Sequence, residues 1–274
     1  MDYTDLTLAR DGAVLTITVD RPEVLNAQSR IMREELDYAL LNAEHDDEVK
    51  VVIIAGTGDH FSSGHDLGSP QEIEDRENRP YSPDTEGEYE RSWQQNIANT
   101  LRWRDFPKPT IAQVQGYCIM GGLILATSCD LIVASDDARF CDRTVRWGGP
   151  HVQYLSLPWE IGVRKAKEYL FTGDWISSEQ ALELGLVNRV VKRDFLQKET
   201  MELAQRIALQ DSFALRLSKA SMNQVQDHMG FRNGIMTGFH SHAIGLSHRR
   251  DTNDDEIDSK DLARKRDEQF GDRA

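Results

Sequence analysis

One short run of β-branched residues constrains the fold of this chain most strongly. Residues Val49 to Ala55 are almost all valine and isoleucine, and the turn Gly56-Thr57-Gly58 follows directly. An apolar run of this length is typical of a strand that is buried on both faces of a sheet. Strands of this kind lie between layers of helices, so we expect an α/β protein.

Extended and helical patterns alternate on both sides of this strand. Asp11-Gly12 separates two extended segments, 6–10 and 14–19, which predicts a hairpin. Residues 29–45 repeat apolar side chains at helical spacing behind Ser29, a suitable N-cap. The same reasoning predicts helices over 92–104 and 121–128, strands over 110–114, 130–134 and 186–191, and mainly helices from Pro158 onward.

Two segments lack a clear periodic pattern. Residues 69–91 are acidic and rich in Pro and Glu, which predicts a long surface loop or a mobile lid. Residues 251–274 carry nine acidic and five basic side chains, as expected of a solvated helix or arm.

Composition excludes several classes of function. The formal charge is -14, from 32 basic and 46 acidic residues, which disfavours binding to nucleic acid. Apolar runs are far shorter than the ~20 residues that cross a bilayer, and the N-terminus lacks a signal-peptide pattern, so we expect a cytoplasmic protein without a membrane span. Three cysteines without a CxxC pair predict neither disulfides nor a zinc site. His240, His242 and His248 have no metal-ligand spacing, and no metal is expected.

Two glycine-containing loops carry the chemistry. Residues 58–67 follow the buried strand, and residues 116–123 follow the strand over 110–114. Turns from a strand into a helix leave backbone N–H groups unpaired, and two such turns side by side could hold one oxygen anion. For either loop alone, tight turning and close packing are the better explanation of the glycines, and only the pairing of the two loops favours an anion site.

Several segments together resemble the crotonase superfamily, which is the enoyl-CoA hydratase and isomerase family. They are R-P-E-V-L-N-A from Arg21, F-S-S-G-H-D-L from Phe61, K-P-T-I-A-Q-V-Q-G-Y from Lys108, Gly121-Gly122, C-D-L-I-V-A-S from Cys129, and the segment 171–191. The resemblance implies a crotonase-like repeated ββα spiral core over residues 1–200. It also implies a helical C-terminal region over residues 201–274 that assembles the chain into a trimer or a dimer of trimers.

The resemblance also implies the binding site. The thioester carbonyl of an acyl-CoA substrate would accept hydrogen bonds from the backbone N–H groups of His65 and Gly121. Preorganised amides of this kind stabilise the negative charge of an enolate. The coenzyme A part of the substrate would follow Leu25, Ala27, Ser63, His65, Asp66 and Leu67, and no separate cofactor is expected. The Asp66 carboxylate is expected to brace its own turn.

The sequence departs from the family at the two glutamates that hydratases use. Their positions hold Ile124 and Thr144, and neither side chain exchanges a proton near neutral pH. We therefore consider His151 as the proton carrier, because an imidazole titrates near neutrality, with Asp142 and Glu160 as weaker candidates. Equally, His151 could be a surface histidine, and Asp142 could pair with a neighbouring arginine.

Two functions follow from these observations. The first is a CoA-thioester enzyme that hydrates, isomerises a double bond, or cleaves a carbon–carbon bond hydrolytically. The second is a non-catalytic acyl-CoA binding or scaffolding protein that kept the pocket and lost the proton-transfer groups.

Overall fold

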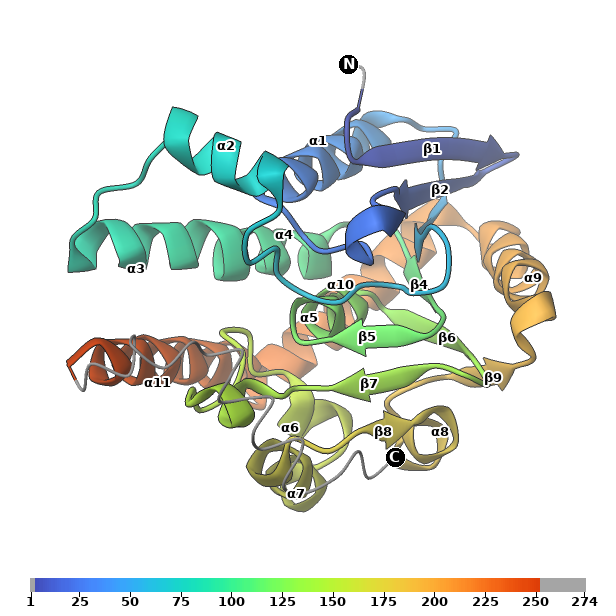
Figure 1. Ribbon diagram of the computed structural model, residues 1–274. Helices are drawn as coiled ribbons and strands as arrows, with labels where there is room; N and C mark the ends of the chain where they lie inside the picture. Colours follow the sequence, from blue (N-terminus) through green and yellow to red (C-terminus); the bar gives the residue numbers. More distant parts are fainter. Residues whose placement is uncertain (1–2, 252–274) are drawn as a thin grey trace.

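The larger of two sheets forms the centre of the computed structural model, which describes residues 3–251 (Figure 1). Its strand order is β1-β2-β3-β4-β6-β9. β1 and β2 form the predicted antiparallel hairpin, and the remaining neighbours pair in parallel. The strands are β1 (Leu6–Asp11), β2 (Val14–Val19), β3 (Val51–Gly56), β4 (Thr110–Val114), β6 (Leu131–Ser135) and β9 (Arg189–Val191).

Burial on both faces explains the β-branched run. Val52 and Ile54 of β3 belong to a hydrophobic cluster with α1 (Arg30–His45) and α5 (Gly121–Ser128). Val51 and Ile53 belong to a second cluster, which α9 (Leu196–Ala208) covers from the other side. Every residue of β3 is buried, so the predicted burial of this strand on both faces, between layers of helices, is confirmed.

A smaller sheet lies beside the first and has the order β5-β7-β8. Its strands are β5 (Tyr117–Ile119), β7 (Arg139–Cys141) and β8 (Ile176–Ser177). Isolated parallel bridges between Gln28 and His65, and between Ser62 and Cys118, continue the same extended pattern. Along most of the core, a strand of the large sheet is followed by a short extended segment and then by a helix. This is the ββα repeat that the resemblance implies.

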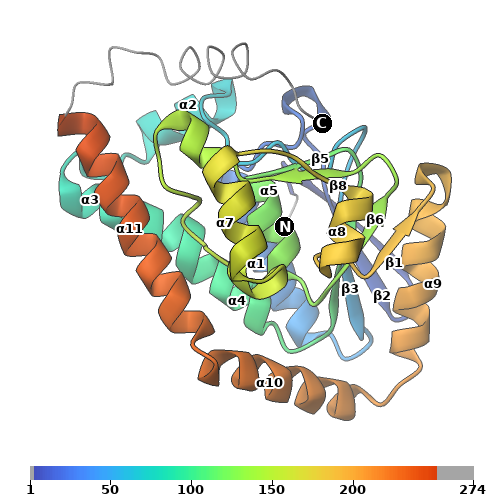
Figure 2. The ribbon, with the colours of Figure 1, turned by 90° about the horizontal axis from the view of Figure 1, so that it is seen from below.

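The remaining helices surround these sheets. α9, α10 and α11 follow one another around the periphery (Figure 2). The other helices of the described chain are α2 (Pro70–Asn78), α3 (Thr85–Trp93), α4 (Asn99–Asp105), α6 (Leu157–Glu160), α7 (Val163–Thr172), α8 (Ser178–Leu184), α10 (Ser212–His228) and α11 (Phe231–Asp251). A π-helical segment, Gln94–Ala98, joins α3 to α4.

The prediction of a loop over residues 69–91 is wrong. Ser69 caps α2 by accepting the N–H of Glu72 at 3.2 Å, with Pro70 in the first turn. Asp84 caps α3 by accepting the N–H of Gly87 at 2.8 Å. Both helices lie at the surface, where few apolar side chains are needed, so their periodicity is weak.

The helix predicted over 29–45 is confirmed, with Ser29 accepting the N–H of Met32 at 2.9 Å. None of the helices between residues 3 and 251 is long and apolar enough to cross a bilayer. The predicted charged arm falls almost wholly outside the described residues, which end at Asp251 in α11.

Candidate active site

The two predicted loops lie against each other. Ser62 donates its N–H to the Tyr117 carbonyl at 2.9 Å and accepts the N–H of Ile119 at 3.0 Å. A Cβ atom on Gly121 would lie only 3.0 Å from the backbone nitrogen of His65. The glycine therefore lets the two backbones approach closely, at a distance where an added Cβ would crowd the His65 nitrogen.

Two amides remain unpaired where these backbones meet. Within the described residues, neither His65 N–H nor Gly121 N–H has a hydrogen-bond acceptor. The Gly121 amide begins α5, and the Gln28 side chain donates to the Gly121 carbonyl at 2.9 Å. The structure thus brings together the two donors predicted for one oxygen anion.

The residue before Gly121 has a strained backbone. Met120 has φ 46° and ψ -101°, although it is not a glycine, and its N–H donates to the Cys141 carbonyl at 2.8 Å. In the described chain, the other non-glycine residues with positive φ are Leu25 and Asn26. A strained backbone persists only where the surrounding structure holds it in place. Such residues cluster at functional sites.

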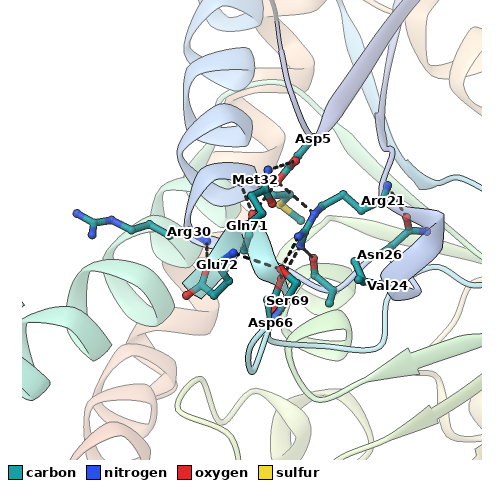
Figure 3. A network of polar contacts seen from close by, with 12 residues as sticks. Asp5, Arg21, Val24, Asn26, Arg30, Met32, Asp66, Ser69, Gln71 and Glu72 are labelled. Carbon is teal, nitrogen blue, oxygen red and sulfur yellow. Dashed lines mark hydrogen bonds and ion pairs between the residues drawn. The ribbon is translucent and has the colours of Figure 1, made fainter. Parts of the chain in front are cut away.

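A buried ionic network braces the His65 loop (Figure 3). Arg21 pairs with Asp66 at 2.9 Å and with Asp5 at 3.3 Å. Asp66 also accepts the N–H groups of Gly68 and Ser69 at 3.0 and 2.7 Å. Burial alone would raise the pKa of Asp66, but hydrogen bonds from Ser69, Gly68 and Arg21 lower it below its ordinary value. The carboxylate therefore braces its own turn, as the sequence predicts.

The residues predicted to follow coenzyme A come together at the surface beside this network. Ser63 donates its N–H to the Leu25 carbonyl at 2.9 Å. Leu25 and Leu67 leave 44% and 56% of their surface exposed, whereas Ala27 is buried. The contact of these residues with coenzyme A stays a prediction.

A cavity of about 260 Å³ lies beside the unpaired amides. Its wall carries positively charged and neutral polar side chains, together with the carboxylates of Asp66 and Glu72. The positively charged and neutral side chains include Gln28, Arg33, His65, Asn96, Thr144 and His242.

The His65 ring is committed to a structural hydrogen bond. Its Nε2 lies 2.8 Å from Oδ1 of Asn96, on the π-helical segment. Because an amide oxygen only accepts, the proton sits on Nε2. Burial, with the nearby Arg33 cation, lowers the pKa of His65 to about 3. The ring is therefore neutral, and the role predicted for His65 rests on its backbone.

The predicted proton carriers do not line the cavity, although Asp142 lies directly behind two residues that do. His151 Nδ1 bonds to the Val152 carbonyl at 2.8 Å. Asp142 accepts from the N–H and hydroxyl of Thr144 at 2.9 and 2.5 Å, and from the N–H of Val152 at 2.8 Å. Burial raises the pKa of Glu160 to about 7, against the opposing effect of Arg104. None of the three carriers lines the cavity beside the amides.

His242 of α11 lines the cavity instead, and sequence reasoning missed it. It is buried, and its Nδ1 lies 2.6 Å from the His151 carbonyl oxygen. Since a carbonyl oxygen accepts, Nδ1 carries the proton and Nε2 keeps a lone pair. Burial lowers the pKa of His242 below its ordinary value, which favours this neutral form. The available signal was the spacing Gly238, His242, Gly245, which places all three on one helix face.

Comparison with known proteins decides the family. Residues 9–241 match the family model for enoyl-CoA hydratase/isomerase. The chain belongs to the enoyl-CoA hydratase/isomerase family. It is a crotonase-type enzyme that acts on CoA thioesters.

Relatives of this hydratase/isomerase family member come from several bacteria. EchA13 of Mycobacterium tuberculosis, assigned as an enoyl-CoA hydratase, is 42% identical over 259 residues, covering 90% of this chain and 81% of the relative. The short-chain-enoyl-CoA hydratase of Clostridium acetobutylicum is 32% identical, with coverages of 82% and 83%. A crystal structure from Mycobacterium smegmatis, assigned as an enoyl-CoA hydratase, is 44% identical with a TM-score of 0.83, covering 89% of this chain and 95% of that one.

Ile124 and Thr144, the positions expected to hold glutamates in hydratases, have different surroundings in this family member. Ile124 is buried in a cluster with Ile97, Tyr154 and Phe239. Thr144 lines the cavity, and its hydroxyl donates to Asp142. Neither side chain supplies a base to the cavity.

Proposed function

We propose that this chain stabilises the enolate of an acyl-CoA thioester, with the thioester oxygen held by the N–H groups of His65 and Gly121. The observation that carries this proposal is the pair of unpaired amides from adjoining loops, beside a cavity. Fixed donors aimed at developing negative charge need no reorganisation during the reaction, which makes them effective in a site that excludes water.

His242 serves as the proton carrier in this proposal. Enolate formation requires a base beside the α carbon, and His242 Nε2 has a lone pair with no hydrogen-bond partner among the described residues. The tautomer is fixed by the His151 carbonyl, so His151 contributes through its backbone rather than its ring. The predicted role of His151 as the base is thus replaced by a positioning role.

Hydration, isomerisation and carbon–carbon cleavage all place negative charge on the thioester oxygen. The decisive experiment therefore measures this shared step. In D2O, the protein should catalyse deuterium incorporation at the α carbon of butyryl-CoA, read by mass spectrometry. His242→Gln should slow this exchange by ~10²-fold or more, the usual contribution of a general base. Calorimetry should show butyryl-CoA binding close to that of the wild type.

His240→Gln provides the matched control, because His240 is exposed on the same helix. It should leave the exchange rate unchanged. Binding of butyryl-CoA without any exchange in the wild type would contradict the proposal and favour an acyl-CoA binding protein. Equal exchange rates in the wild type and His242→Gln would remove His242 from the mechanism.

A further inference from the structure

Arg33 is a buried cation on the cavity wall. It lies on α1 with 3% of its surface exposed, and it lines the cavity beside the two amides. Its guanidinium donates to the Gln95 carbonyl and, at 2.7 Å, to Oε1 of Gln28. Both acceptors are neutral.

No carboxylate of residues 3–251 lies within 4.0 Å of this guanidinium. Other arginines on the same wall differ in this respect. Arg76 pairs with Glu72 at 2.8 Å, and Arg30 pairs with Glu34 at 3.1 Å. Glu72 and Asp37 act on Arg33 only at longer range.

Among the described residues, the nearest favourable partner of this charge, apart from the two neutral acceptors, is the Trp103 ring, whose centroid lies 5.9 Å from the Arg33 Cζ. A buried charge without an anionic partner is unfavourable, because burial removes its hydration. Burial accordingly lowers the pKa of Arg33 to about 10, against the opposing effects of Glu72 and Asp37. The side chain is nevertheless a cation at pH 7.

Only two of the five N–H donors of the Arg33 guanidinium have acceptors in the described structure. The two carboxylates on the same wall, Asp66 and Glu72, are already paired with Arg21 and Arg76. An anion that reached Arg33 would therefore meet both a positive charge and available donors.

We propose that the substrate's acyl group carries a carboxylate that pairs with Arg33. This inference rests on the proposed function, because it assumes that the thioester oxygen lies at the His65 and Gly121 amides. The Gln28 side chain connects Arg33 to the pair of amides. Its Oε1 accepts from Arg33, and its Nε2 donates to the Gly121 carbonyl. The carboxylate therefore belongs to a short acyl chain, close to the thioester.

The phosphates of coenzyme A are the other source of an anion in such a substrate. The predicted coenzyme path ends at the cavity, because Leu67 lines it, but its outer part follows exposed residues such as Leu25. Arg33 instead is buried on the wall, where its charge acts on the His65 ring. The acyl end is thus the better match.

The test compares thioesters that differ only at the end of the acyl chain. Succinyl-CoA is paired with butyryl-CoA, and glutaryl-CoA with pentanoyl-CoA, so that a carboxylate replaces a methyl group. Calorimetry and α-deuterium exchange are measured for each. The wild type should favour the carboxylate in at least one pair by about tenfold or more, the range of a charged hydrogen bond. Arg33→Met should reduce that ratio to near one, and Arg33→Lys should restore part of it.

A wild type without preference in either pair would overturn the inference, whatever the variants do. Arg33→Met weakening both members of a pair and free coenzyme A by the same factor would also overturn it, because that pattern indicates phosphate binding. A preference in binding without any exchange would support the acidic acyl group while contradicting the proposed enolate chemistry.

Discussion

His65 combines a partly buried, neutral ring with an unpaired backbone amide, and the ring makes stability depend on pH. Its pKa is about 3 in the fold and 6.5 ordinarily. Between these values the unfolded chain takes up a proton that the folded chain does not, so the free energy of unfolding falls as pH falls below 6.5. Between pH 6.5 and 5 the expected loss is about 2 kcal/mol.

Urea unfolding at pH 7.5 and pH 5.0 checks this prediction. Other groups also titrate in this range, so the informative quantity is the difference between wild type and His65→Gln, whose side chain does not titrate. The variant should lose less stability on acidification. Equal losses in the two proteins would show that the His65 ring does not control this dependence.

At the residue scale, backbone roles were easier to predict than side-chain roles. The two glycine loops after strands are local in the sequence, and the resemblance of these contiguous segments to the family assigned His65 and Gly121 as the donors. His242 reaches the cavity only because α11 packs against residues 150–159, far earlier in the chain. Its role depends on tertiary contacts, which no local pattern contains.

Among the elements, α11 depends on glycines for its close packing. A Cβ on Gly238 would lie 2.7 Å from Cβ of Leu155, and one on Gly245 would lie 2.7 Å from Cδ of Pro150. His242 lies between them on the same face. The glycines therefore set how closely the helix carrying His242 approaches the cavity.

Gly238→Ala should destabilise the protein despite the higher helix propensity of alanine. Overpacking of this kind costs about 1–3 kcal/mol, and displacement of α11 should also slow α-deuterium exchange. Thermal unfolding and the exchange assay measure the two effects. Thr237→Ala, at an exposed neighbouring position, should change neither by a comparable amount. Increased stability of Gly238→Ala would contradict this prediction, because it would show that α11 accommodates the added methyl group without losing packing energy.

Element prediction succeeded where burial imposes a pattern. β3, β4 and α5 have their predicted positions because their side chains face the core on both sides. α2 and α3 were missed because they lie at the surface and their apolar pattern is weak. Their caps, Ser69 and Asp84, were present in the sequence, but a cap alone does not distinguish a helix start from a turn.

At the scale of the whole molecule, α10 and its C-cap Met229 expose several large apolar side chains. Phe213, Leu217, Met222, Val225 and Met229 leave between 51% and 72% of their surface exposed. Exposed apolar patches mark interfaces, so we predict a homo-oligomer in solution. The family resemblance implies that it is a trimer or a dimer of trimers. Light scattering after size exclusion should give a multiple of 31.2 kDa.

The double variant Val225→Glu/Met229→Glu should shift this mass toward a single chain. Leu41→Glu, at an exposed position on α1, serves as the control and should keep the wild-type mass. A wild type that is monomeric at micromolar concentration would contradict the prediction.

The position of α11 in the chain also orders events during synthesis. Ribosomes add about 5–20 residues per second, and earlier segments fold first. Both glycine loops therefore leave the ribosome well before His242. On the proposed function, the growing chain gains the means to hold a thioester oxygen before it gains the base that acts on the substrate. A product of translation that stopped between His228 and Phe231 would contain both sheets and both glycine loops but not His242, so binding alone would not report a finished protein.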